Sequence, residues 1–111
     1  MTDASNLVDK RCKACKGGMP PMVKEQSQEY LAKVLGWELV EGTKIKKEFK
    51  FKKFLDSIAF VNKIADIAEA EGHHPTITII YNKVKITLST HAIGGLSEND
   101  FIIAAKIDRL I

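Results

Sequence analysis

Thr76–Thr90, TITIIYNKVKITLST, is the stretch on which the fold prediction depends. Apolar and polar side chains alternate on both sides of Asn82-Lys83, which predicts two antiparallel strands joined by a two-residue turn. In that hairpin Tyr81 pairs with Val84, and the register brings the apolar side chains to one face of the sheet. These side chains are Ile77, Ile79, Tyr81, Val84, Ile86 and Leu88.

A long amphipathic helix is predicted immediately before this hairpin, over Lys53–Glu71. Apolar residues recur there three or four positions apart, which is the spacing of a helix face packed on a sheet. They are Phe54, Ile58, Val61, Ala65 and Ala68, with Leu55, Ile64 and Ile67 widening the stripe. Gly72 suits the left-handed residue that follows a helix, and Pro75 prevents the helix from resuming.

A short helix and two strands are predicted further upstream. The segment 24–35, KEQSQEYLAKVL, has apolar residues at helical spacing and is ended by Gly36. The predicted strands Trp37–Glu41 and Ile45–Phe51 flank Gly42–Lys44, because a three-residue connection containing glycine is a common hairpin loop.

The C-terminal helix is predicted to open with a capping box at Ser97–Asp100. Its body, FIIAAKIDRLI, is apolar almost all round, so we expect a second apolar stripe to contact a partner subunit. The complete pattern, α-β-β-α-β-β-α, predicts an α+β fold: one two-layer domain with a four-stranded antiparallel sheet and helices on one face. We expect this domain over residues 23–111, after an N-terminal loop or lead-in over residues 1–22.

The composition fits one globular domain that binds neither membranes nor nucleic acids. The chain has 111 residues, 45% hydrophobic and 28% charged, with a net charge of +3. Its apolar runs are shorter than the roughly 20 residues that cross a bilayer, and its N-terminus lacks a secretory pattern. Six lysines in Lys44–Lys53 interleave with Ile45, Phe49 and Phe51, which favours a strand with one solvent-exposed face over a nucleic-acid surface.

The two cysteines, Cys12 and Cys15, form a CxxC motif. A structural zinc site takes four ligands, and this motif lies in a segment rich in lysine and glycine rather than at the start of a helix in a βαβ unit. The favoured interpretation is a pair of reduced thiols in a loop. Zinc shared across subunits, or with His73 and His74, is the minority alternative.

The three histidines are expected to meet at one end of the sheet. His73 and His74 follow the long helix in EAEGHHP, residues 69–75, and His91 ends the last strand. Continuing the predicted register places His91 across from His74, on the face opposite the apolar one. Histidine is suited to proton transfer near neutral pH, so a proton-transfer site is favoured over surface histidines at a helix end.

Acidic residues are placed to join these histidines. Glu69 lies four positions before His73 and would face it on a continued helix. Asp100 has two interpretations of equal weight: the acid of the capping box, or a group that orients His91 or holds a substrate N–H. Zinc is the weaker alternative, because adjacent histidines on a turn point apart and HxH and HExxH spacings are missing.

The run from Glu69 through His73-His74-Pro75 to Tyr81, His91 and Asp100 resembles the signature of pterin-4a-carbinolamine dehydratases. The segment YNKVKITLSTHAIGGLSENDF, residues 81–101, is similar to these enzymes, as are CKACKGGMPPM at 12–22 and GWELVEG at 36–42. The resemblance covers nearly the whole chain.

This resemblance implies a hydro-lyase that dehydrates 4a-hydroxytetrahydropterin to quinonoid dihydropterin without a metal or cofactor. The reaction recycles the cofactor of aromatic amino acid hydroxylases. By carry-over His73, His74 and His91 surround the 4a-hydroxyl, with His73 or His91 as proton donor and His74 placing the substrate. Asp100 would orient a histidine, Glu69 is a weaker orienting candidate, and Pro75 is a structural or orienting residue beside them.

The resemblance also implies a homodimer or homotetramer with a pterin as its small-molecule partner. We expect a cytoplasmic protein, present also in the nucleus if it shares the coactivator role of animal members. The alternative function is a non-enzymatic oligomerisation or transcriptional coactivator module on the same fold.

Overall fold

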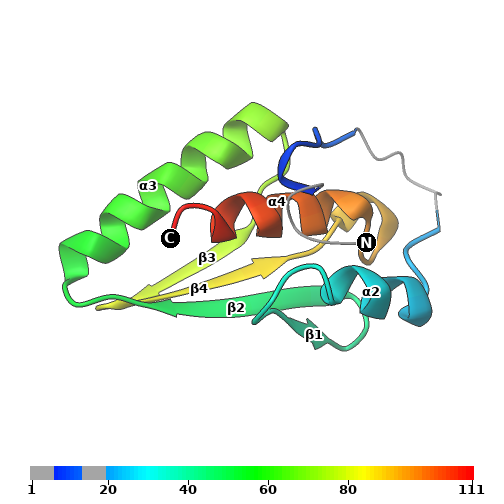
Figure 1. The fold of residues 1–111 in the computed structure, drawn as a ribbon, viewed down its shortest axis with the longest axis horizontal. Helices are drawn as coiled ribbons and strands as arrows, with labels where there is room; N and C mark the ends of the chain where they lie inside the picture. The colour runs from blue at the N-terminus through cyan, green and yellow to red at the C-terminus, as the bar shows by residue number, and fades with distance from the viewer. Residues whose placement is uncertain (1–6, 14–19) are drawn as a thin grey trace.

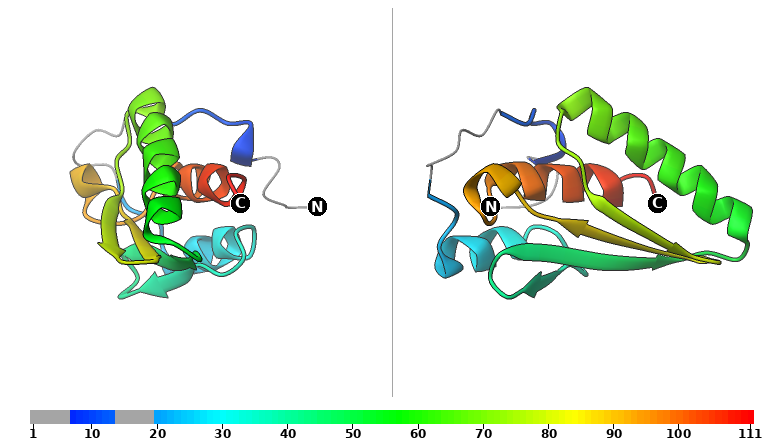
Figure 2. Two further views of the ribbon diagram at one scale, coloured as in Figure 1. Left: turned by 90° about the vertical axis from the view of Figure 1, so that its left-hand side faces the viewer. Right: turned by 180° about the vertical axis from the view of Figure 1, so that it is seen from behind.

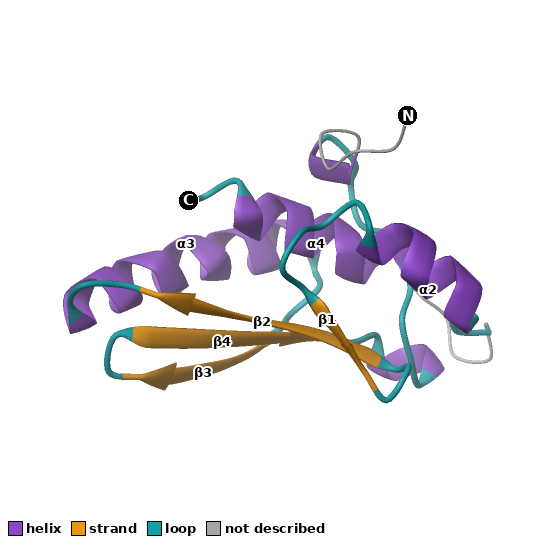
Figure 3. Ribbon diagram, turned by 60° about the horizontal axis from the view of Figure 1, so that its bottom comes forward, coloured by secondary structure: helices purple, strands orange, loops and turns teal. Residues whose placement is uncertain are grey.

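A computed structural model describes residues 7–13 and 20–111. Its helices are α2 (Lys24–Leu31), α3 (Phe54–Glu71) and α4 (Glu98–Asp108), and its strands are β1 (Glu38–Val40), β2 (Lys44–Lys50), β3 (Thr76–Ile80) and β4 (Lys83–Leu88). The strands form one antiparallel sheet in the order β1-β2-β4-β3, and the helices cover one of its faces (Figure 1, Figure 3). The predicted α+β class and element order are confirmed.

The β3–β4 hairpin turns one residue earlier than predicted. Tyr81 and Asn82 form the turn, and Tyr81 has a left-handed backbone with φ 52°. Asn82 is fixed there because its carbonyl accepts a hydrogen bond from the Phe51 amide at 2.7 Å and its side chain donates to the Phe51 carbonyl at 2.9 Å. Ile79 therefore pairs with Val84, a position that the predicted register gave to Tyr81. The side chains within the two strands keep their predicted faces, since the two registers share the same parity. Tyr81 is the exception, because it lies in the turn and is 65% exposed.

Two upstream boundaries also differ from the prediction. Helix α2 ends at Leu31, four residues before the predicted end. The loop between β1 and β2 has the predicted three residues but covers 41–43 rather than 42–44. Both Glu41 (φ 54°) and Gly42 (φ 72°) adopt left-handed conformations, which let the chain reverse within this short loop.

Four of the six lysines of the lysine-rich run lie in strand β2, which is half-buried as predicted. Ile45 and Phe49 are buried beneath the helices, whereas Lys46 alternates with them and lies on the open face. Lys47 shares the helix-covered face, and its ammonium group binds the Asp108 carboxylate of α4 at 2.9 Å.

Helix α3 begins one residue later than predicted and ends at the predicted residue, but its buried face is rotated. Ser57, Phe60, Ile64 and Ala68 are its buried residues, and only the last two belong to the predicted stripe. Phe54 and Leu55 are 45% and 72% exposed, because the first turn of α3 extends beyond the end of the sheet (Figure 1, Figure 2). Apolar periodicity alone therefore gave the helix correctly and its contact face only in part.

Helix α4 is buried within a single chain. Residues 101–105 and Ile107 are each at most 1% exposed. Residues 7–13, which were expected to form part of a loose lead-in, contribute to this cover: Leu7 is 1% exposed, and the Lys106 ammonium donates to the Val8 carbonyl at 2.6 Å. The prediction that a second stripe of α4 contacts a partner subunit is therefore wrong, because the chain covers that stripe itself. Within the described part of the chain, no helix is long and apolar enough to cross a bilayer.

Candidate active site

His73 is positioned by the end of α3. Gly72 takes the left-handed conformation after the helix (φ 65°), and the His73 amide donates back to the Ala68 carbonyl at 3.2 Å. This turn directs the His73 side chain towards α4, where its Nε2 lies 2.6 Å from Oδ1 of Asp100. The His73 side chain is 13% exposed and that of Asp100 is completely buried. A carboxylate only accepts, so Nε2 of His73 carries the hydrogen and Nδ1 is left for other chemistry.

Asp100 combines the two roles that the sequence left open, although its histidine partner is His73 rather than His91. Its second oxygen, Oδ2, accepts from the Ser97 amide at 3.0 Å and from the Thr90 hydroxyl at 2.8 Å. The first contact belongs to the capping box of α4. The carboxylate is thus fixed on one side by the helix start and presents its other side to His73.

His74 and Glu69 form a second, solvent-exposed pair. Glu69 Oε2 lies 2.5 Å from Nε2 of His74, and the two side chains are 78% and 59% exposed. The expectation that Glu69 faces His73 is wrong, because the helix ends at Glu71 and the turn at Gly72 redirects His73. Solvent screens a pair this exposed, so the contact orients His74 more than it stabilises the fold.

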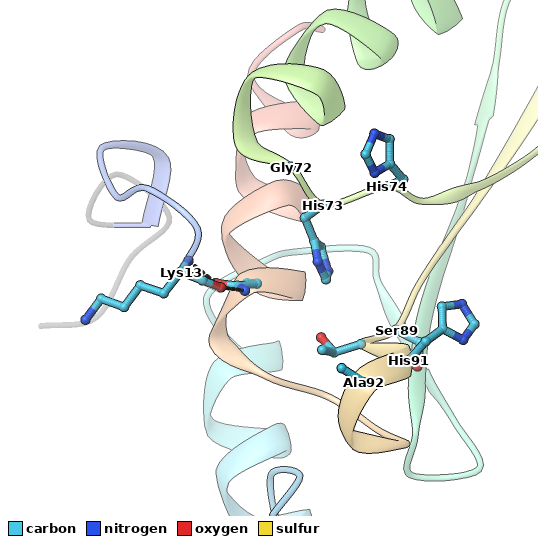
Figure 4. Close-up of a pocket in the computed structure, with 9 residues that line it drawn as sticks. Lys13, Gly72, His73, His74, Ser89, His91 and Ala92 are labelled. Carbon is cyan, nitrogen blue, oxygen red and sulfur yellow. Dashed lines mark hydrogen bonds between the residues drawn. The ribbon is translucent and has the colours of Figure 1, made fainter. Parts of the chain in front are cut away.

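His91 does not lie across a strand ladder from His74 as predicted. Strand β4 ends at Leu88, and His91 begins a 3₁₀ helix over His91–Ile93. Its side chain is exposed, and in Figure 4 its ring points away from His73. The short helix forms because Thr90 and Gly95 pair in an isolated bridge, which closes the intervening residues into a tight loop.

A pocket of about 290 Å³ nevertheless brings the three histidines together (Figure 4). It is lined by Lys13, Gly72, His73, His74, Ser89, Thr90, His91, Ala92 and Asn99. A second hollow of about 220 Å³ shares His74, Ser89 and His91 with it. Asp100 and Glu69 stand behind the histidines that they contact, and Pro75 lies outside the lining, as the residue that leads from His74 into β3.

Six residues that line this pocket were not among the predicted site residues: Lys13, Gly72, Ser89, Thr90, Ala92 and Asn99. Thr90 and Asn99 each precede a predicted site residue, so adjacency was the only signal that could have found them. Lys13 carried no such signal, since it is remote in sequence and reaches the pocket only through tertiary packing.

Cys12 is half-buried, and Cys15 lies outside the described residues. Burial raises the pKa of the Cys12 thiol to about 12, with a further contribution from the nearby Glu71 carboxylate. The thiol is therefore protonated at neutral pH, and its Sγ lies 3.7 Å from the Asn99 carbonyl. Among the described residues, no three His, Cys, Asp or Glu side chains lie close enough together to hold a metal ion.

The fold and the pocket together define the class of protein: a small α+β domain in which a buried carboxylate holds a histidine at the edge of the sheet. The family model for pterin 4 alpha carbinolamine dehydratase matches residues 20–110. A protein of Nitrosospira multiformis that bears this family's name is 50% identical over 109 residues, covering 98% of this chain and 96% of its own. One of Methylococcus capsulatus is 44% identical over 109 residues, covering 97% and 96%.

Two solved structures with a similar fold are also described as pterin dehydratases or as similar to them. A crystal structure described as a transcriptional coactivator/pterin dehydratase from Brucella melitensis has a TM-score of 0.77 at 34% identity, and the match covers 81% of this chain and 97% of that one. A pterin dehydratase-like protein described as a RuBisCO assembly factor has a TM-score of 0.58 at 27% identity, over 68% and 88%. The chain belongs to the pterin-4a-carbinolamine dehydratase family, as its signature predicted.

Proposed function

We propose that this protein dehydrates 4a-hydroxytetrahydropterin to quinonoid dihydropterin by histidine acid/base catalysis. In this reaction the N5–H proton leaves, a C4a–N5 double bond forms, and the C4a–O bond breaks. The departing hydroxyl takes up a proton and leaves as water. The reaction therefore needs one group that accepts a proton and one that donates it, and each such group contributes about 10²- to 10⁴-fold.

The observation that supports the proposal most strongly is the His73–Asp100 pair, 2.6 Å apart at the pocket wall. With Nε2–H held by Asp100, the His73 imidazole offers its Nδ1 lone pair as the base for N5–H. The carboxylate then stabilises the imidazolium that forms. We assign the donation of a proton to the leaving hydroxyl to His91, whose exposed ring exchanges protons with solvent, and the placement of the pterin to His74.

An activity assay tests this assignment of roles directly. The substrate is generated enzymatically, and formation of quinonoid dihydropterin is followed with and without the purified protein. We expect the wild type to accelerate dehydration, and His91→Ala to lower kcat by about 10²-fold, the lower end of the range for a proton-transfer residue. His74→Ala is expected to raise KM more than it lowers kcat. A folded wild type that does not accelerate the reaction would overturn the proposal and favour the non-enzymatic interaction module.

We also propose that the protein is a homodimer or homotetramer. The support is a group of exposed apolar side chains from two segments, the start of α3 and the β3–β4 turn. Figure 1 shows that these two segments lie at the same end of the molecule. Leu55 is 72% exposed, Ile80 60% and Tyr81 65%, and β3 is an edge strand of the sheet. An exposed apolar cluster beside an unpaired strand edge is a common site of self-association.

Light scattering after size exclusion tests this interface. The double variant Leu55→Lys/Tyr81→Lys is expected to reduce the mass to that of a monomer, because a charged side chain at an apolar interface is costly to bury. Leu35→Lys is the matched control, since Leu35 is 80% exposed but leads into β1, the edge strand opposite β3. A wild-type monomer, or an unchanged mass in the double variant, would contradict this interface.

A further inference from the structure

Residues Arg11–Lys13 contact the end of α3 that carries His73. The Cys12 amide donates to Oε1 of Glu71 at 2.8 Å, and Nε of Arg11 lies 3.1 Å from Oε2. The side chain of Glu71 is only 7% exposed, and Glu71 is the last residue of α3. These three residues lie outside the segment 20–110 that the family model matches, yet they anchor a helix end two positions from His73.

Cys12 and Lys13 of this segment also contact the start of α4, which carries Asp100. The Asn99 carboxamide pairs with both backbone groups of Lys13: Oδ1 accepts from the amide at 2.9 Å, and Nδ2 donates to the carbonyl at 2.5 Å. Asn99 is 6% exposed and directly precedes Asp100. In Figure 4 the Lys13 side chain points away from the histidines, so these backbone contacts are what place Lys13 at the pocket wall.

We propose that Arg11–Lys13 is a positioning strap that sets the spacing between His73 and Asp100 by tying Glu71 to Asn99. The catalytic consequence of this strap rests on the proposed dehydratase function. The two helix ends belong to segments far apart in the chain, and the His73–Asp100 hydrogen bond joins them on one side. The strap connects the same two helix ends a second time, so two separate connections fix the position of His73 relative to Asp100. A misplacement of about 1 Å in such a site can cost as much as 10²-fold in rate.

The charges around the strap support this role. Burial acts to raise the pKa of Glu71, but the hydrogen bond from the Cys12 amide and the charges of Arg11 and Lys106 outweigh it and lower that pKa. Glu71 is therefore ionised at neutral pH, as an acceptor that binds the strap with charge-assisted hydrogen bonds. Cys12, whose thiol is protonated and lies against Asn99, reports whether the strap is in place, because its alkylation must be slow while it is held there.

The variant Asn99→Ala tests the strap, and Asp108→Ala is the matched control. Asp108 is at the other end of α4, where it accepts from the Trp37 indole at 3.0 Å and binds Lys47, so its loss destabilises the same helix without touching the strap. Both are made in a Cys15→Ser background, so that alkylation reports Cys12 alone. We expect Asn99→Ala to speed Cys12 alkylation and to lower kcat about tenfold with KM within about twofold, since the reacting groups are displaced and not removed.

A proton NMR signal gives a readout that is independent of turnover. The His73 Nε2–H, donating to a carboxylate, is expected at a strongly downfield shift in the wild type and in Asp108→Ala, and to move or broaden in Asn99→Ala. If Cys12 is alkylated faster in Asn99→Ala while the His73 signal and kcat are unchanged, the proposed role of the strap is overturned. If Asn99→Ala does not fold, Glu71→Gln is measured instead, with the same expected directions and the same overturning result. If the wild type has no dehydratase activity but the His73 signal still moves in Asn99→Ala, the proposed function is overturned and the strap is supported.

Discussion

Replacing His73 with alanine is expected to lower kcat for dehydration by about 10²- to 10⁴-fold, the range for a single proton-transfer group. His73 is the one histidine of the three that is largely buried, at 13% exposure, and it is anchored by a fully buried carboxylate. Its loss removes the proposed base and also leaves Asp100 without its charge-assisted partner. The measurement is kcat and KM for formation of quinonoid dihydropterin, with far-UV circular dichroism to establish that the variant is folded.

His74→Ala serves as the control for this experiment. His74 is adjacent in sequence, but its ring is 59% exposed and its partner Glu69 is on the surface. Its variant is therefore expected to act mainly through KM. Added imidazole should restore part of the activity of His73→Ala, because the deleted side chain leaves room for a free base at the pocket wall. A folded His73→Ala enzyme with kcat within about threefold of wild type would place the proton transfer elsewhere, since losing a proton-transfer group costs far more.

The hairpin shows why the fold could be predicted from sequence although its register could not. The turn shifted by one residue because Asn82 binds Phe51 of a neighbouring strand, and that contact is invisible in the local pattern. Alternation depends only on parity, so the shift left the buried face formed by Val84, Ile86 and Leu88 intact. A prediction of the fold class therefore stays correct when a turn is misplaced, provided that each strand residue keeps its face of the sheet.

The candidate site was predictable in its residues and less so in its pairings. His73, His74 and His91 do line one pocket, but the partner of Asp100 is His73 and the partner of Glu69 is His74. Spacing along a helix predicts neighbours only while the helix continues, and here α3 ends between Glu69 and His73. The contribution of residues 7–13 was missed for a related reason: contacts that span most of the chain leave no periodic signal.

Replacing Asp100 with asparagine is expected to lower kcat by about 10²-fold or more while the protein remains folded, because the hydrogen on His73 changes position. The Ser97 amide and the Thr90 hydroxyl both donate to the same side of residue 100, so the asparagine carbonyl must take that side. Its NH₂ group then faces Nε2 of His73, which has to become the acceptor. The hydrogen moves to Nδ1, and the imidazole no longer offers a lone pair to the N5–H of the substrate.

Two further variants separate this effect from helix capping. Asp100→Ala also removes the acid of the capping box. It is expected to cost about 2–4 kcal/mol in urea unfolding, since the Ser97 amide and the buried Thr90 hydroxyl lose their acceptor. Ser97→Ala weakens the capping box by about 1 kcal/mol but leaves the Asp100–His73 contact in place, so its kcat should match wild type. Nitrogen-15 chemical shifts of His73 report the tautomer directly. If Ser97→Ala loses as much activity as Asp100→Asn, the tautomer explanation is wrong. Asp100 would then contribute to turnover by stabilising the start of α4.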